Sequence, residues 1–123
     1  MGVRVGLVAP VVAWAALIFY LSSLPNPPGQ PSEEWVSYAA HLTEYAVLGF
    51  LSARLLSGQF GSLGGAAWVV AWAAAAASGV SDEVHQAFGP GRDATPVDWL
   101  FDAAGALAGV LTWLAWSRVR SPG

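Results

Sequence analysis

Four long apolar runs alternate with short polar segments along the chain. The runs are Val5–Leu24, Tyr38–Leu56, Leu63–Val80 and Pro96–Trp116. At a rise of about 1.5 Å per residue, a helix of each length would cross a hydrocarbon layer of about 30 Å. The pattern therefore predicts one all-α domain, 1–123, that is an integral membrane four-helix bundle. The expected helices are 5–24, 33–57, 63–86 and 96–117.

The segments between the runs contain residues that stop helices. Residues 25–32 read Pro-Asn-Pro-Pro-Gly-Gln-Pro-Ser, which cannot form a helix and is too polar for lipid. Thr95, Pro96 and Asp98 resemble a capped helix start with proline in the first helical position. The first run is longer than the core of a signal peptide, and three more runs follow it. We therefore expect it to be retained as a helix.

The arginines indicate an orientation for this bundle. Four chain crossings put Arg4, Arg54, Arg118 and Arg120 on one side and only Arg92 on the other. Because basic residues concentrate on the cytoplasmic side of membrane proteins, this predicts that both termini are cytoplasmic. The loops near residues 25–32 and 88–95 would then face outward.

Composition supports the membrane interpretation and excludes several classes of protein. Apolar residues make up 55% of the chain and charged residues only 11%, whereas a soluble domain has about 25% charged residues. A net charge of −3 without a basic stripe argues against a nucleic-acid partner. The chain has no cysteine, so disulfides, thiolate metal sites and cysteine nucleophiles are excluded.

Polar residues, most of them ionisable, gather at the predicted outer ends of three helices. They are His41, Glu44 and Tyr45 on the second helix, Asp82, Glu83, His85 and Gln86 on the third, and Asp98 and Asp102 on the fourth. His41, Glu44 and Tyr45 share a helical face, as do Asp98 and Asp102. Three polar faces at similar depth predict a common polar site at the outer face of the membrane. Charged groups within the membrane are costly and usually functional.

Several of these residues also have a structural interpretation. Asp98 can be a helix cap, Glu83 and His85 can be solvated at a helix end, and His41 can bond a backbone carbonyl. The aromatic residues Tyr38, Tyr45, Trp35, Trp68, Trp99 and Trp113 fit an interfacial belt or core packing. The spacing of Gly105 and Gly109 favours close helix packing, within the chain or in an oligomer.

The charge balance limits what the site can bind. Five acids, Glu44, Asp82, Glu83, Asp98 and Asp102, outnumber Arg92 and the two histidines. Such a site suits a divalent cation, or acids that share protons, better than a bare phosphate. A carboxyl group or histidine can act as a general acid or base. A zinc site made by His41, Glu44 and His85 matches no strong metal signature, and a serine nucleophile is disfavoured.

Four segments together resemble the VanZ-like family. They are Trp14–Pro25, His41–Gly49, Ser81–Arg92 and Asp98–Gly109. The block Asp-Glu-x-x-Gln-x-Phe-x-Pro-Gly-Arg, followed by Asp98 and a glycine-spaced helix, is the specific part. The resemblance implies a small bacterial multi-pass membrane protein of a family named for a protein linked to teicoplanin resistance.

The family motif maps onto named positions of this chain. They are His41, Tyr45, Asp82, Glu83, Gln86, Arg92, Asp98 and Asp102. Many relatives have Asp-Lys where this chain has Ser37 and Tyr38, and Asn where it has Asp102. The first departure removes a lysine from the expected site, and the second adds an acid to it.

Two hypotheses for the function follow, and a transporter is disfavoured because the charges lie at one end. In the first, the site modifies a lipid or cell-wall precursor and lowers teicoplanin susceptibility. The expected catalytic residues are His41, Glu44, Asp82, Glu83, Asp98 and Asp102, and the expected substrate-binding residues are Tyr45, His85, Gln86 and Arg92. In the second, the polar cluster is a head-group site or an ion-pair network without catalysis.

Overall fold

The computed structural model describes residues 2–23, 34–60, 66–87 and 96–120, apart from several side chains near the helix ends. These residues form α1 (Val5–Ser23), α2 (Glu34–Phe60), α3 (Ala66–Ala87) and α4 (Pro96–Arg120). No strand occurs in these ranges. The prediction of an all-α chain with four helices is therefore confirmed, and each helix end lies within three residues of its predicted position.

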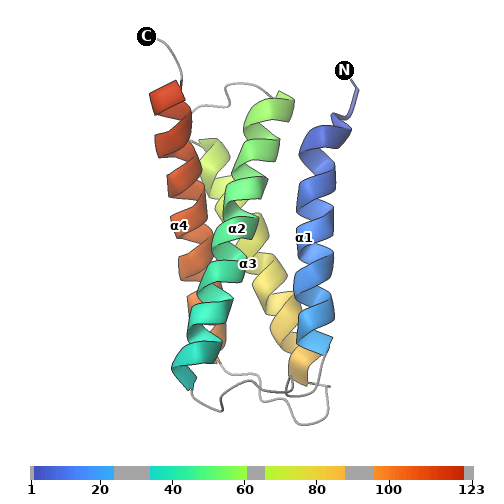
Figure 1. Ribbon diagram of the computed structural model, residues 1–123, viewed down its shortest axis with the longest axis vertical. Coiled ribbons are helices and arrows are strands. Elements are labelled where there is room, and N and C mark those ends of the chain that lie inside the picture. The colour runs from blue at the N-terminus through green and yellow to red at the C-terminus, as the bar shows by residue number, and fades with distance from the viewer. Residues whose placement is uncertain (1, 24–33, 61–65, 88–95, 121–123) are drawn as a thin grey trace.

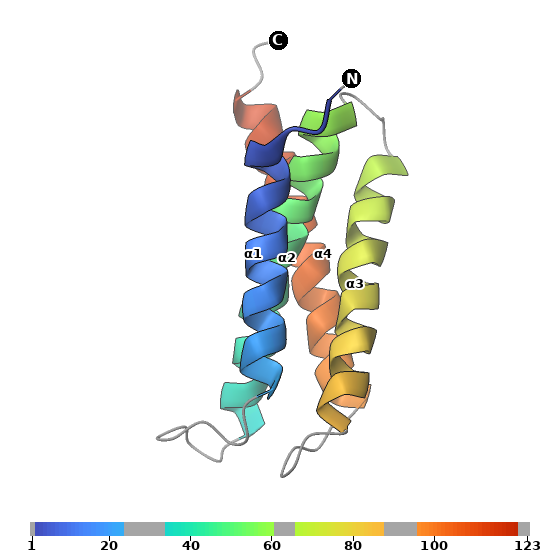
Figure 2. The ribbon, with the colours of Figure 1, turned by 90° about the vertical axis from the view of Figure 1, so that its right-hand side faces the viewer.

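The helices run alternately up and down, so both termini lie at one end of the bundle (Figure 1). We call the opposite end the distal end; there α1 and α3 finish, and α2 and α4 begin. The most extensive contact joins the parallel helices α2 and α4. Helix α3 packs against both of them, whereas α1 packs on α2 and α3 and does not contact α4 within the described residues (Figure 2).

Three buried glycines allow α2 and α4 to approach closely: Gly49 in α2, and Gly105 and Gly109 in α4. A Cβ atom on Gly105 would overlap the carbonyl oxygen of Leu42, and one on Gly109 would overlap that of Ala46. The structure therefore uses the face of Gly105 and Gly109 for packing within the chain. An oligomer formed through these two glycines stays a prediction, and it would require α2 to leave this face.

Tryptophan side chains link neighbouring helices through their indole N–H groups. Trp14 of α1, Trp72 of α3, and Trp99 and Trp113 of α4 all donate hydrogen bonds to another helix. The acceptors are the carbonyl oxygens of Glu44, Ala103 and Ala76 and the hydroxyl of Ser57, at 2.8, 3.0, 3.0 and 3.1 Å in the same order. Such bonds give polar indole groups a partner inside an apolar bundle.

The aromatic residues of the predicted belt therefore differ in their surroundings. Trp99 and Trp113 pack between helices, and Trp113 also meets Phe50 edge to face with ring centroids 5.3 Å apart. Trp68 is exposed, and the side chain of Trp35 lies outside the described residues. Core packing thus accounts for Trp99 and Trp113.

Helix α4 contains a 21-residue stretch, Trp99–Val119, that is long and apolar enough to cross a membrane. The apolar part of α1, Val5–Leu21, is shorter. Over the described residues this criterion therefore identifies one spanning helix, where the sequence pattern predicts four. The polar residues of α2 and α3, among them Glu44, Arg54 and Asp82, lower the mean hydropathy of those helices.

Candidate functional site

Polar side chains are buried inside the bundle near its distal end. His41 of α2 is 8% exposed, Asp82 of α3 is 5% exposed, and Asp102 of α4 is fully buried. Tyr45, one turn after His41, is 1% exposed. His41, Asp82 and Asp102 lie within about two turns of the distal ends of their helices, and Tyr45 lies about three turns from the start of α2. The fold therefore brings ionisable groups from three helices to similar depth.

A short polar contact in this region joins α2 to α4. The His41 Nδ1 atom lies 2.6 Å from Asp102 Oδ1, and the two residues are 61 positions apart in the sequence. When Asp102 is ionised its carboxylate can only accept, so Nδ1 then carries the proton and its N–H group donates the hydrogen bond to Oδ1. The carboxylate thereby fixes the orientation and tautomer of the imidazole. Nε2 is then the ring nitrogen that can accept or release a proton. This arrangement is one that proteins use to orient a general base.

Gly79 of α3 provides the space that the Asp102 carboxylate occupies. A Cβ atom at position 79 would lie 3.1 Å from both Cβ and Oδ2 of Asp102, and 3.3 Å from Cδ1 of Trp99. Contacts this short would force the carboxylate to shift. Asp102 is therefore positioned between His41 on one side and the backbone of α3 at Gly79 on the other.

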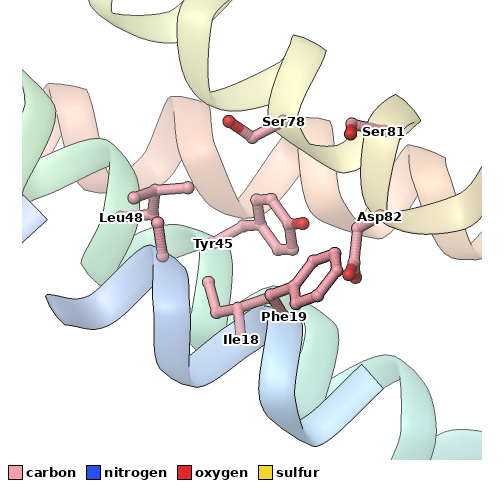
Figure 3. Close-up of a pocket in the computed structure, with 8 residues that line it drawn as sticks. Ile18, Phe19, Tyr45, Leu48, Ser78, Ser81 and Asp82 are labelled. Carbon is pink, nitrogen blue, oxygen red and sulfur yellow. The ribbon is translucent and has the colours of Figure 1, made fainter. Parts of the chain in front are cut away.

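A pocket of about 170 Å³ lies between α1, α2 and α3. Its described lining consists of Ala15, Ile18, Phe19, Tyr45, Leu48, Ser78, Ser81 and Asp82. Figure 3 shows Tyr45, Phe19 and Asp82 directed toward the same space. We call this space the distal pocket. One wall is apolar and comes mainly from α1, and the opposite wall carries the hydroxyl and carboxyl groups of α3.

Aromatic rings stack beside the polar residues. Phe19 of α1 stacks on His85 of α3, with ring centroids 4.1 Å apart and an interplanar angle of 21°. Tyr38 of α2 stacks on Phe101 of α4 at 4.5 Å and 5°. His85 is half-buried and packs against Phe19, a ring that lines the distal pocket.

The remaining predicted site residues lie at several kinds of position. Glu44 is half-buried in α2, and its backbone carbonyl accepts the Trp14 indole bond. Glu83 and Gln86 lie in α3 and Asp98 in the first turn of α4, but their side chains are outside the described residues. Arg92 is outside the described residues altogether. Their expected roles as catalytic or binding residues stay predictions.

The cation hypothesis concerns the same end of the bundle. Among the side chains that the structure describes, no three histidine, aspartate or glutamate residues form a group that can hold a metal ion. This statement about metal-binding groups does not cover Glu83 and Asp98, since their side chains are not described.

Sequence reasoning did not predict that α1 contributes to the site. Ala15, Ile18 and Phe19 line the distal pocket, although α1 contains no acidic or basic side chain between Val5 and Leu21. A helix that is apolar all round gives no signal of which face packs inward. The aromatic residue Phe19 near the distal end was the available hint, but the sequence pattern alone does not distinguish it from a lipid-facing residue.

The comparisons with known proteins identify one family. The family model described as VanZ/LLP1 matches residues 7–117, which is nearly the whole chain and includes every described residue of the site. No curated protein matches the chain. No solved structure matches it either.

Proposed function

This chain belongs to the VanZ/LLP1 family, and from that premise we propose that it is a four-span membrane protein of the bacterial cell envelope. We propose further that the distal end faces outward and acts on a lipid or cell-wall precursor, which lowers teicoplanin susceptibility. The observation that carries the proposal is the buried His41–Asp102 pair, one helical turn before Tyr45, which lines the distal pocket.

The distribution of polar and apolar side chains supports the membrane placement. Large apolar residues are exposed on all four helices, for example Val12, Leu42, Val70 and Leu111 at 60%, 39%, 55% and 51%. The interior instead holds ionisable groups and many small residues, which suits helix packing in lipid. Helices of 19 to 27 residues are about 28–40 Å long, comparable to a hydrocarbon layer of about 30 Å.

The orientation is supported by the arginines at the end that carries the termini. Arg4 donates to the carbonyl oxygen of Gly58 at 3.1 Å, and Arg54 donates to that of Gly6 at 3.4 Å. Arg118 lies near the end of α4 at the same side. An excess of arginine at this end favours a cytoplasmic location for both termini. The distal end then faces the outside.

The chemistry that the site supports is proton transfer next to a bound polar group. A histidine oriented by a carboxylate can remove or supply a proton through Nε2. Asp82 and Tyr45 in the distal pocket can bind the polar part of a substrate, while the α1 wall contacts its apolar part. Glu44, Glu83, Asp98, His85, Gln86 and Arg92 complete the proposed site.

The non-enzymatic alternative has one observation in its favour. The His41–Asp102 pair joins α2 to α4, which are the two helices with the most extensive contact in the bundle. A polar pair in this place also holds the two helices together. In that case the distal end binds a head group or a partner protein without changing it. The two functions differ in whether a substitution that preserves the fold abolishes activity.

The first test is teicoplanin susceptibility in a sensitive Gram-positive host. We expect expression of the wild type to raise the minimal inhibitory concentration, and Asp82→Asn to return it to the empty-vector value. His41→Gln should have the same effect if proton transfer is required. Membrane levels are matched by immunoblot for every variant.

Matched controls are available on the same helices. Thr43 and Thr112 are exposed and bond the carbonyl oxygens of Ala39 and Ala108 in their own helices, so Thr43→Ala and Thr112→Ala should retain full protection. Protection that survives both Asp82→Asn and His41→Gln would end the catalytic hypothesis. A well-expressed wild type that gives no protection would end the resistance proposal.

A further inference from the structure

The distal pocket has two chemically different sides. Ile18 and Leu48 provide buried apolar surface at 4% and 3% exposure. Facing them, Asp82 provides a carboxyl group at 5% exposure, and Ser78 and Ser81 provide hydroxyl groups. A site of this kind fits a ligand that has a short apolar stem and a polar end.

The charge of the pocket lining determines which polar group of a ligand can bind there. Among the described lining residues there is one acid and no lysine, arginine or histidine. A buried carboxylate is stabilised by a cation or a strong hydrogen-bond donor and is destabilised by an anion. The rings of Phe19 and Tyr45 line the same space, and aromatic faces attract ammonium groups. The lining therefore favours a positively charged group.

The exposed lining residues show where the pocket opens. Phe19 is 52% exposed on α1, and Ser78 and Ser81 are exposed on α3. Helices α1 and α3 also touch least of the helix pairs that are in contact. The mouth therefore lies between these two helices on the side of the bundle. In the proposed membrane placement, this side faces lipid.

We propose that the distal pocket binds an alkylammonium group carried by a membrane amphiphile, which enters sideways between α1 and α3. A volume of about 170 Å³ is close to that of a cavity that holds benzene, so the bound portion has about six heavy atoms. An ethanolamine head group and the amine of a lipid-linked peptide share this chemistry. The inference rests on the proposed membrane placement and names the ligand class of the proposed site.

The test uses the full chain purified in a neutral maltoside detergent and three probes of matched size. These are n-butylammonium, n-butanol and butyrate. Because a ligand that binds only the folded state raises the unfolding temperature, the midpoint is measured against the concentration of each probe. We expect a saturable rise with n-butylammonium, and no saturable rise with n-butanol or butyrate.

Two variants separate binding from folding. Asp82→Asn removes the charge, and we expect it to weaken n-butylammonium binding by about tenfold or more. Ser81→Leu keeps Asp82 but narrows the mouth from an exposed position, so it should weaken all binding while the protein stays folded. Thr43→Ala, on the exposed face of α2, should bind like the wild type and controls for the effect of a substitution away from the pocket.

The outcomes are independent of the resistance test. Equal midpoint shifts for n-butylammonium and n-butanol, or shifts that persist unchanged in both Asp82→Asn and Ser81→Leu, would overturn the inference even if the protein protects against teicoplanin. Specific binding without protection would uphold it and leave the resistance proposal to fail alone. Displacement of n-butylammonium by short-chain phosphatidylethanolamine, but not by a lysine-containing peptide, would assign the ammonium group to a phospholipid.

Discussion

At the scale of single residues, the contact between His41 and Asp102 links two positions that the sequence keeps far apart. Both side chains are buried between α2 and α4, so each provides the polar partner that the other needs there. Removing one partner of such a pair leaves the other buried beside apolar surface. Replacing both residues with apolar ones leaves no buried polar group that needs a partner.

The pair therefore predicts a non-additive effect on stability. We expect His41→Leu and Asp102→Leu each to lower the free energy of unfolding by about 3–5 kcal/mol, and the double variant to lower it by less than the sum. Reversible unfolding in mixed micelles measures all three. Thr112→Ala serves as the reference and should change little, since Thr112 is exposed. Strict additivity would mean that the two side chains are not coupled.

Both residues of this pair could be predicted as site residues, but their contact could not. Helical spacing places His41 and Asp102 at similar depth on different helices, and that part follows from the sequence. Which atoms meet depends on how α2 is rotated and shifted against α4. That register is set by backbone contacts at Gly105 and Gly109, and glycine spacing alone permits more than one partner helix.

At the scale of helices, α2 and α4 form the central pair of the bundle. Their close approach requires glycine at the contact positions, because a Cβ atom there would overlap the backbone of the other helix. Gly109→Ala would place a Cβ atom onto the Ala46 carbonyl, so the helices would have to separate. We expect the variant to lower the free energy of unfolding by about 1–3 kcal/mol and to weaken the His41–Asp102 contact.

A matched glycine is available for comparison in α1. A Cβ atom on Gly6 would meet nothing within 4 Å, so Gly6→Ala should leave stability unchanged or raise it slightly. The same unfolding measurement applies to both variants. Equal stability of Gly109→Ala and Gly6→Ala would contradict the close packing of α2 on α4.

The four helices could be predicted from apolar run length and from helix-stopping residues, and the observed ends agree closely with that pattern. The position of α1 could not. Its outer and inner faces have the same apolar character, so only the structure identifies Ile18 as buried and Tyr20 as exposed. The apolar wall of the distal pocket was missed for that physical reason.

At the scale of the whole molecule, the proposed topology places the termini and the distal end on opposite sides of a membrane. The natural chain has no cysteine, so single-cysteine variants report one position each. We expect a membrane-impermeant maleimide to label Gln30→Cys in intact cells and Val3→Cys only after permeabilisation. Gln30 lies in the predicted outer loop, and Val3 precedes α1 on the predicted cytoplasmic side.

Each labelling variant also has a clear contrary result. Labelling of Val3→Cys in intact cells, with Gln30→Cys protected, would reverse the orientation and place the distal pocket on the cytoplasmic side. Labelling of both in intact cells would contradict the membrane placement of α1. Denatured protein labelled in parallel shows that each cysteine is reactive.

The long sequence separation between His41 and Asp102 also affects how the protein is made. A ribosome adds about 5–20 residues per second, so the 61 positions between them take about 3–12 s to synthesise. During that interval His41 has been synthesised, but the carboxylate that finally bonds it does not yet exist. Helix α1 has no acidic or basic side chain that needs such a partner. In the proposed membrane placement, we therefore expect the second helix to depend on water or on an insertion factor until the fourth helix is made.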